Sequence, residues 1–488
     1  MALVQFTRMH YRCAARLLLV STLLSGVADL AVAADPMSDL FQPDVLRTGA
    51  ALKQRTAGLT DPWGHDCALP VGPLSLPAAV DLALCRNPTT RSAWAAASQQ
   101  AAVLGSAESA WLPGLVATGS ESRAYGEHVD INGDIDTTPQ NTRDAALNLS
   151  WTLYDFGARG GRIDSARRIL DAAAATASSV SQQTVFNVVL SYYGVVAGDA
   201  GLLAARTTED ADQKGLEVAR TLLEGGVATL ADELQAATAY DQAVLARIQA
   251  ERAAISARGQ LAVVIGFPAD QPLKLDSQPV PAEVPALTAR MADLMTEAAR
   301  QRPDLAAALA QRDAAEAQVT VARAVGRPSI TVSAGRELSD TSGIPHQNFS
   351  QIGVNITVPI FTGFNVGYGV RQAQAQLQAQ DASVEQVRLN VSLDVWNAYY
   401  SLDSANQQLV ATATLIKSAE DNQQVALGRY QSGVGTIIDL LTAQSAAASA
   451  RQLRIAAELG WQVARAQLAL ALGHLSGTVP LDVSAALP

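Results

Sequence analysis

The chain has 488 residues, a formal net charge of -11 at pH 7, and a charged-residue content of 17%. Aromatic residues make up only 5% of it, and Lys and Arg form no cluster that is interleaved with aromatics, which argues against nucleic-acid binding. Long stretches rich in Ala and Gln are typical of extended helices that meet along thin apolar seams, and not of a thick globular core.

The N-terminus has the pattern of a secretory signal peptide over residues 1–34. Three arginines precede the apolar run LLLVSTLLSGVADLAVA, which ends at Ala33 in an A-x-A cleavage pattern. An uncleaved membrane anchor is the alternative, but Asp29 interrupts the run, and a spanning helix needs roughly 18 clean apolar residues. We find no later segment with the length and apolarity of a transmembrane helix. We therefore expect a protein that leaves the cytoplasm without a helical anchor.

Two cysteines remain after the signal peptide, Cys67 and Cys85. In an oxidising periplasm such a pair is a candidate disulfide. It would tie an N-terminal periplasmic arm, residues 35–73, to the first helix. Two unpaired buried thiols are the alternative, because bridge geometry depends on a distance that the sequence does not give.

The strongest feature of the sequence is an internal repeat. Asn87-Pro88 matches Arg302-Pro303 at an offset of 302 − 87 = 215, and Gly226-Val227 matches Gly433-Val434 at an offset of 433 − 226 = 207. The difference of 215 − 207 = 8 residues falls in the polar segment GEHVDINGDIDTTPQN of the first copy, which is expected to be a hairpin loop. The predicted organisation has a first structural repeat over 74–273, a linker over 274–286, a second structural repeat over 287–473 and a C-terminal tail over 474–488.

Each copy is predicted to contain a helix, two strands, a very long helix and a final helix. The expected ranges are Leu76–Ala110 and Leu287–Val325 for the first helix, Leu115–Tyr125 and Ser329–Leu338 for the first strand, and Ile163–Glu224 and Val370–Gln431 for the long helix. About 60 helical residues make a rod on the order of 90 Å. A lone helix of that length cannot bury its apolar positions, so the long helices are expected to pair as coiled coils.

The second strand of each copy alternates apolar and polar side chains. The apolar positions are Leu147, Leu149, Trp151 and Leu153 in the first copy and Ile352, Val354, Ile356 and Val358 in the second. About ten residues at a steep tilt cross the apolar layer of a bilayer, so these positions are predicted to face lipid. An ordinary sheet half buried on a core is the alternative. Open sheet edges are not tolerated in lipid, so other copies of the chain must close a barrel of 8 or 12 strands from two or three protomers.

The duplicated order, the signal peptide, and a Tyr-x-x-Gly before a Thr-x-x-Asp helix start together resemble the TolC-like outer-membrane efflux proteins, over about Leu74 to Gly473. The resemblance implies a mainly α fold with a β-barrel portion. In it, a homotrimer shares a 12-stranded barrel in the outer membrane and continues into a coiled-coil tunnel through the periplasm. It also implies three contacts: outer-membrane lipid, a periplasmic adaptor (membrane fusion protein), and an inner-membrane ABC exporter or other pump.

The resemblance places the channel entrance in the segment RYQSGVGTIIDLL of the second copy. Tyr430 and Asp439 match positions that hold the entrance closed, whereas the Arg and the second acidic residue of the family pattern are replaced here by Gly435 and Thr442. A single ring of Asp439 is therefore expected, with Asp232 as its counterpart in the first copy. Stabilisation of a helix N-terminus, with Thr436 as the cap, is the alternative role for these carboxylates.

No HExxH, CxxC, nucleophile elbow or P-loop pattern occurs, so we expect no enzyme, no cofactor and no metal site. The implied function is a passive export duct, and the chain most resembles the members that secrete cyclolysin-type toxins through a type I system. An outer-membrane factor of a small-molecule or drug efflux pump is the alternative within this class. A trimeric structural or adhesive surface protein is the alternative from another class, and strands that lie inside each repeat, between helices, disfavour it.

Overall fold

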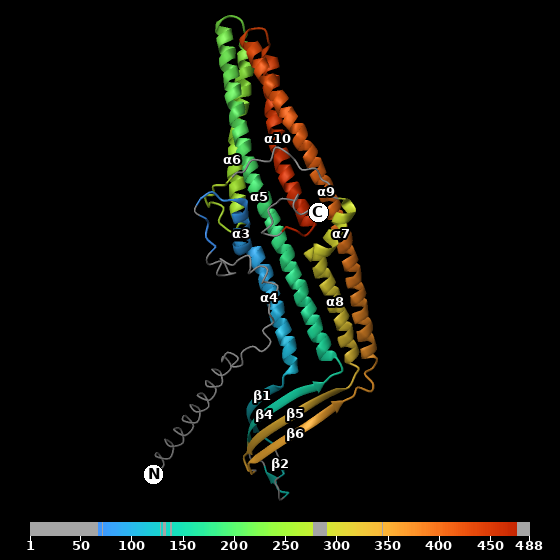
Figure 1. The fold of residues 1–488 in the computed structure, drawn as a ribbon. Helices are drawn as coiled ribbons and strands as arrows, with labels where there is room; N and C mark the ends of the chain where they lie inside the picture. Colours follow the sequence, from blue (N-terminus) through green and yellow to red (C-terminus); the bar gives the residue numbers. More distant parts are fainter. Residues whose placement is uncertain are drawn as a thin grey trace, which may run out of the picture. The chain divides into compact units, whose positions relative to one another are not determined.

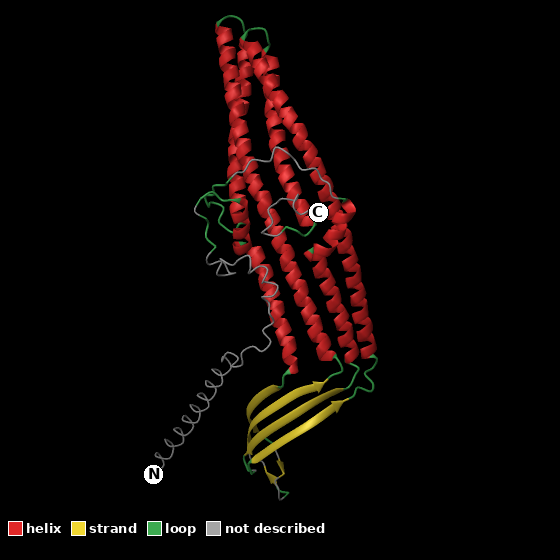
Figure 2. Cartoon of the chain, in the orientation of Figure 1, coloured by secondary structure: helices red, strands yellow, loops and turns green. Residues whose placement is uncertain are grey.

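The computed structural model describes residues 67–70, 72–126, 128–129, 133–136, 139–276, 290–343 and 345–475. The predicted signal peptide and almost all of the predicted N-terminal arm, linker and tail lie outside the described residues. All described residues belong to one compact unit, which spans 45–488. Figure 1 shows a bundle of helices with a curved sheet at one end, and Figure 2 shows that helix is the dominant element.

Each repeat begins with two helices where one continuous helix was predicted, so that part of the prediction is wrong. The first repeat has α3 (Leu76–Arg86) and α4 (Pro88–Glu108), and the second has α7 (Met291–Gln301) and α8 (Pro303–Ala324). The helices break at Asn87 and Arg302, which are both extended. A proline disfavours helical backbone at the residue before it but suits the first position of a new helix, so each Pro ends one helix and starts the next.

The long helices have the same lengths in both repeats. Helices α5 (Ala158–Glu224) and α9 (Asn365–Gln431) have 67 residues each, and α6 (Leu230–Val264) and α10 (Ile437–Ala471) have 35 each. Helix α5 lies along α6, α9 lies along α10, and α5 also packs against α8 and α10, which joins the two repeats (Figure 1). The prediction that each long helix packs along other helices is therefore confirmed.

The seam of α9 shows why these helices pair. Its buried residues include Val384, Val391, Val395, Leu402 and Leu409, which follow one another at spacings of seven or four. This is the heptad spacing that keeps one apolar stripe against a partner helix. The pattern explains how a 67-residue helix remains packed although the chain has few aromatic residues.

Four strands form one antiparallel sheet in the order β1 (Gly114–Ala124), β4 (Gln140–Tyr154), β5 (Ser329–Thr341) and β6 (Gln347–Thr357). The connection between β1 and β4 contains a small hairpin of β2 (His128–Val129) and β3 (Ile135–Asp136). Val358 lies one residue beyond β6, so its assignment to the strand is wrong. Pairing stops where Ser329 meets Thr357, because Pro328 and Pro359 flank these residues and proline has no N–H for the ladder.

The end of each final helix packs against the helix break of the same repeat. A Cβ atom on Gly266, after α6, would lie 2.8 Å from Cβ of Arg86, and a Cβ atom on Gly473, after α10, would lie 2.8 Å from the carbonyl oxygen of Gln301. Both glycines have positive φ, 85° and 79°. Apolar clusters surround these contacts: one joins α3, α5 and α6, and the other joins α7, α9 and α10.

One helix of the described residues, α5, is long and apolar enough to cross a membrane by length and composition. The expectation that no such segment follows the signal peptide is therefore wrong by this measure. A helix of this length and composition can cross a membrane or lie in a protein core. In the most apolar 18-residue segment of α5, 28% is buried inside the chain. Part of the apolar character has a packing cause, because Val185, Val188, Val189 and Val195 belong to the core cluster with α3 and α6.

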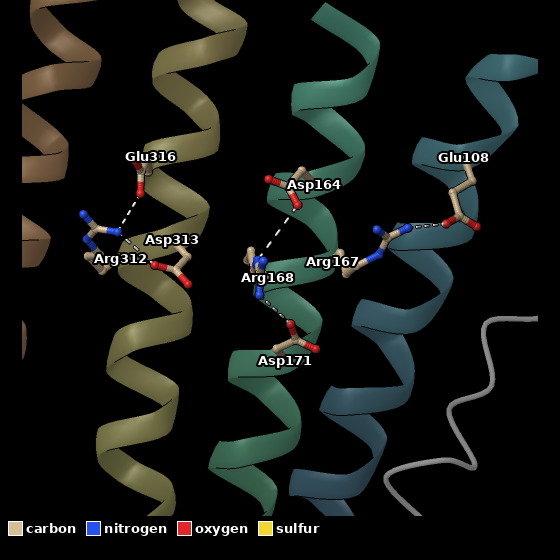
Figure 3. Close-up of polar contacts among 8 residues, drawn as sticks. All are labelled: Glu108, Asp164, Arg167, Arg168, Asp171, Arg312, Asp313 and Glu316. Carbon is tan, nitrogen blue, oxygen red and sulfur yellow. Dashed lines mark hydrogen bonds and ion pairs between the residues drawn. The ribbon is translucent and has the colours of Figure 1, made fainter. Parts of the chain in front are cut away.

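Ion pairs run along the helices near the sheet (Figure 3). Arg167 of α5 lies 3.4 Å from Glu108 of α4, and Arg312 of α8 lies 3.1 Å from Asp381 of α9. Among the residues that the structure describes, Arg168 pairs only within α5, with Asp164 and Asp171. Exposed pairs of this kind contribute about 0–1 kcal/mol each, so the apolar seams hold the bundle together.

Cys67 and Cys85 are joined by a disulfide, with their Cα atoms 6.5 Å apart. Both residues are buried in the cluster around α3, and Nη1 of Arg86 donates a hydrogen bond of 3.0 Å to the carbonyl oxygen of Cys67. The bond attaches the segment before α3 to the helical body.

The double substitution Cys67→Ser/Cys85→Ser is expected to lower the free energy of unfolding by about 3 kcal/mol, because the unfolded chain loses a constraint on a short loop. Thermal unfolding in detergent measures the change. Thiol labelling of the unreduced, denatured wild type should find no free thiol at these two positions, and labelling of both would contradict the bridge.

The substitution Gly473→Ala is expected to destabilise the protein by about 1–3 kcal/mol, because the new Cβ meets backbone and φ is positive. Gly460 lies inside α10 with nothing within 4 Å of its Cβ position, so Gly460→Ala is the matched control. It is expected to be neutral or stabilising by up to about 1 kcal/mol, since Ala favours a helix interior. Equal melting temperatures of the two variants would contradict the contact.

Candidate functional site: a two-faced sheet and a helical entrance

The sheet has one face that is apolar across all four strands. Leu149 pairs with Leu115 on one side and Ala334 on the other, and Ala334 pairs with Ile352. Directly paired residues point to the same side of a sheet, so these side chains share a face. Further members of the face are Leu147, Trp151, Val332, Val354 and Ile356. Ile352 is 81% exposed, so the chain leaves the centre of this face uncovered.

The opposite face of the sheet is polar and cross-linked by hydrogen bonds. The carboxylate of Asp144 on β4 accepts hydrogen bonds from Ser120 on β1 at 3.2 Å and from Ser339 on β5 at 2.7 Å. Asn355 on β6 donates to Ser333 on β5 at 3.3 Å. A face of this chemistry is suited to water, and the apolar face to lipid, which is the arrangement of a transmembrane barrel.

Exposed aromatic side chains gather where the strands join the helices. They are Trp111, Trp151, Tyr154, Phe156, Phe361, Phe364 and Tyr368. Indole Nε1 of Trp151 donates to the carbonyl oxygen of Trp111 at 2.9 Å. Amphipathic rings concentrate at membrane–water interfaces, so this girdle marks the inner edge of the lipid layer. Sequence reasoning missed it, although the aromatic–glycine pairs at both strand ends were a visible signal.

Arg159, at the start of α5, is a second residue that sequence reasoning missed. Its guanidinium lies 3.7 Å from the centre of the Trp111 ring and donates to the carbonyl oxygens of Ala110 and Thr152 at 3.1 and 2.8 Å. The side chain is buried, with 3% of the residue exposed. These contacts fix the end of β4 and the turn after α4 to the same helix, and so join the sheet rigidly to the bundle.

At the opposite end of the bundle the two helical turns lie beside each other (Figure 1). Gly226 and Gly433 both have φ of 74°, and a Cβ atom on Gly433 would lie 3.6 Å from Cγ1 of Val227. Below the turns, an apolar cluster draws residues from four helices: Leu216, Ala219, Ala236, Tyr430, Ile437 and Leu440. The structure therefore places the predicted entrance segment of the second repeat beside its counterpart in the first.

Asp232 and Asp439 occupy equivalent positions in two capping boxes. In the second box Oδ2 of Asp439 accepts from the N–H of Thr436 at 3.2 Å, while Oγ1 of Thr436 accepts from the N–H of Asp439 at 3.2 Å. Hydrogen bonding to Thr436 is the largest cause that lowers the pKa of Asp439, so its carboxylate is ionised near neutral pH. Asp439 is exposed on the first turn of α10, and Thr442 is exposed on the second.

Tyr430 is the buried member of the predicted entrance, with 4% of the residue exposed. Its hydroxyl has no hydrogen-bond partner among the described residues. Burial and then the charge of Asp232 raise the pKa of Tyr430, so the hydroxyl is neutral and lies in the field of that carboxylate. Asp232 instead accepts from the N–H of Thr229 at 2.8 Å.

The family model described as "Outer membrane efflux protein" matches residues 79–267 and 294–474, which covers most of both repeats. The chain belongs to the outer membrane efflux protein family. It is 30% identical over 390 residues to the protein named CyaE of Bordetella pertussis, covering 78% of this chain and 80% of the relative. It is 26% identical over 384 residues to the cobalt-zinc-cadmium resistance protein CzcC of Cupriavidus metallidurans, covering 78% and 85%.

Among solved structures, the outer-membrane channel OprN superposes with a TM-score of 0.73 at 22% identity, covering 82% of this chain and 90% of that one. At this identity the likeness shows the fold. With the family match, it makes the chain an outer-membrane export channel whose sheet spans the outer membrane and whose helices extend into the periplasm. Members of this family are channels and not enzymes.

The substitution Tyr430→Phe is expected to change the melting temperature by less than about 1 °C, because it removes a hydroxyl that makes no hydrogen bond to any residue that the structure describes. Tyr430→Ala, which empties a buried site in the entrance cluster, is expected to cost about 3–5 kcal/mol. A Phe variant as unstable as the Ala variant would show that the hydroxyl has a partner in the assembled channel.

Proposed function

We propose that this chain is the outer-membrane duct of a type I secretion system that exports a protein toxin of the cyclolysin type. It works as a homotrimer, in which three chains with four strands each close one 12-stranded barrel. The duct is passive, and the energy for export comes from an inner-membrane ABC exporter. The sequence resemblance and the similarity to CyaE support this cargo class.

The duct function is supported by two features that occur together in one sheet of the described residues: an uncovered apolar face and edge strands that lack a partner on one side. Among the described residues β1 and β6 each pair on one side only, with β4 and β5 respectively. Backbone groups left unpaired in lipid cost several kcal/mol each, so further copies of the chain must pair with these edges. The polar face then lines the lumen.

The tip of the helical bundle has the chemistry of a docking surface for a periplasmic adaptor. Val227 and Leu230 in the first turn, and Val434 and Ile438 in the second, are each between 62% and 74% exposed. Apolar side chains at a periplasmic end favour burial against a protein partner. This supports an adaptor at the tip, with the inner-membrane pump beyond it.

The entrance is proposed to carry one ring of Asp439, with one carboxylate from each protomer. The carboxylate is exposed and ionised, and the family's Arg is replaced by the uncharged Gly435. The charge of Arg429 also lowers the pKa of Asp439, as the last of the causes. Three like charges around one axis attract cations. Asp232 is half buried, and its role is that of a cap alone.

Efflux of small molecules or metal ions is the second candidate function, and the 26% identity to CzcC favours it. The two candidates differ in the inner-membrane partner and not in the barrel. An adhesive or structural surface protein finds no support, since the chain belongs to a channel family.

The substitution Val354→Asp places a charge at the centre of the apolar face and is expected to hinder stable insertion, because a charge at the bilayer midplane is unfavourable in every protomer, although Asp costs less than Arg or Lys, for which the cost is about 2–4 kcal/mol. The matched control is Asn355→Asp, on the polar face of the same strand, which is expected to insert. Heat-modifiable mobility of the trimer in extracted outer membranes measures assembly. Normal assembly of the Val354 variant would contradict the lipid-facing assignment.

The substitution Asp439→Ala is expected to lower the cation preference of the channel, and Asp232→Ala to change it less. Reversal potentials across a salt gradient in a planar bilayer measure both. Equal selectivity of the wild type and the Asp439 variant would leave only the capping role for this residue.

The cargo is tested by secretion. Cells that lack their own outer-membrane duct receive this chain with a toxin-type ABC exporter and its adaptor, or with a small-molecule pump and its adaptor. We expect the protein substrate in the medium in the first case and no added drug or metal tolerance in the second. The reverse result would establish efflux as the function.

A further inference from the structure

The apolar face of the sheet ends, on the side away from the helices, in a row of charged side chains. Glu121 on β1, Arg143 on β4 and Asp340 on β5 are paired in register, so they lie side by side on this face. Arg143 lies 3.0 Å from Glu121, and Nδ1 of His346 lies 3.1 Å from Asp340. Glu121 and Arg143 neutralise each other, and Asp340 contacts His346, which carries a charge only when it is protonated.

Arg336 is on the same face but nearer to the apolar residues. It pairs with Leu147 on β4 and with Ser350 on β6, and its same-face neighbours along β5 are Ala334 and Leu338. Arg336 is exposed, and no hydrogen bond or ion pair joins its side chain to any residue that the structure describes. Arg123 of β1 lies on the same face, on the far side of the charged row. Its Cζ atom lies 5.1 Å from the centre of the Tyr125 ring.

The position of Arg336 corresponds to the boundary of the lipid layer on the side away from the helices. On β1 and β4 the face lacks charge as far as Gly119 and Ala145, whereas on β6 it turns polar after Ile352, at Ser350. The boundary therefore steps across the sheet. Strands of a barrel are tilted, so a level line around it crosses successive strands at different registers. From the helical end of the sheet, the first polar side chains of this face are Arg336 on β5 and Ser350 on β6, and Leu338 lies beyond Arg336 on β5.

A guanidinium at that level is suited to an anionic partner. An arginine on the lipid face is unfavourable at the bilayer midplane but tolerated near the interface, where it reaches polar groups. Its planar fork of N–H donors matches the oxygens of a phosphate. The side chain of Ser350 begins about 5 Å across the strand pair and adds a hydroxyl donor. The girdle of aromatic side chains lies at the strand ends that join the helices. The opposite strand ends, on the side of the charged row, therefore face the outer leaflet.

We propose that Arg336 and Ser350 form a binding site for the phosphate group of an outer-leaflet lipid, one site on each chain. The phosphate accepts hydrogen bonds from the guanidinium and from the hydroxyl, and the acyl chains lie along the apolar face beside Ile352 and Val354. The site holds an anionic lipid at one fixed level along the axis of the barrel. It goes beyond the export function, because cargo does not pass this face.

The test uses the full-length protein in detergent, titrated with lipid A that carries both phosphates and, in parallel, with dephosphorylated lipid A. Native mass spectrometry counts bound lipids, and thermal unfolding gives an apparent affinity. We expect the phosphorylated form to bind the wild type about tenfold more tightly than it binds Arg336→Gln, since the substitution removes charge-assisted hydrogen bonds to the phosphate. Ser350→Ala is expected to weaken binding less, and Arg336→Lys to restore part of it.

The matched control is Arg388→Gln, an exposed arginine on α9, which is expected to bind as the wild type does. Equal affinity of the wild type and Arg336→Gln, or equal affinity for both lipid forms, would overturn the proposal. Stabilisation of the wild type by inorganic phosphate alone, lost in Arg336→Gln, would also overturn it in favour of a free-phosphate site. Single-channel conductance of Arg336→Gln should equal that of the wild type, which separates this site from the export function.

Discussion

The structure depends on one constraint: a backbone N–H or C=O group in the membrane must find its hydrogen-bond partner within protein. The helices satisfy it alone, but the four-stranded sheet cannot, because its outer strands have one unpaired edge each. The sheet is thus incomplete as a membrane element until other copies close it. Folding of the transmembrane part and assembly of the channel are consequently one event, and a single chain has no stable membrane-inserted form.

The junction between the sheet and the helical bundle is held by several hydrogen bonds. A barrel fixed in lipid and a bundle in water move independently unless something joins them. Arg159 provides this connection in the first repeat through the ring of Trp111 and the carbonyl oxygens at the end of β4. Arg327 adds a hydrogen bond of 3.2 Å to the carbonyl oxygen of Phe156. The strands therefore lead into the helices without a flexible hinge, which suits a continuous duct.

The sequence predicted the parts of the fold that repeat with a period. Alternation located the second strands, the runs rich in Ala and Gln indicated the long helices, and the two offsets of the internal repeat located the loop between β1 and β4. It failed where a local backbone effect overrides a period, as at Asn87-Pro88 and Arg302-Pro303, and at Val358, where two prolines end the pairing. The roles of Arg159 and Arg336 depend on strand register and on contacts between distant segments. No pattern within one segment contains that information.

The equal lengths of the helices in the two repeats also restrict how the gene can change. Both hairpins of long helices must end at the same level for the turns at Gly226 and Gly433 to meet, so a residue gained or lost in one hairpin displaces its turn relative to the other. The eight extra residues of the first repeat lie instead in the connection between β1 and β4, beyond the charged row of the sheet. That connection is where peptide tags, epitopes or new surface loops are expected to be tolerated, whereas the helical hairpins admit only substitutions.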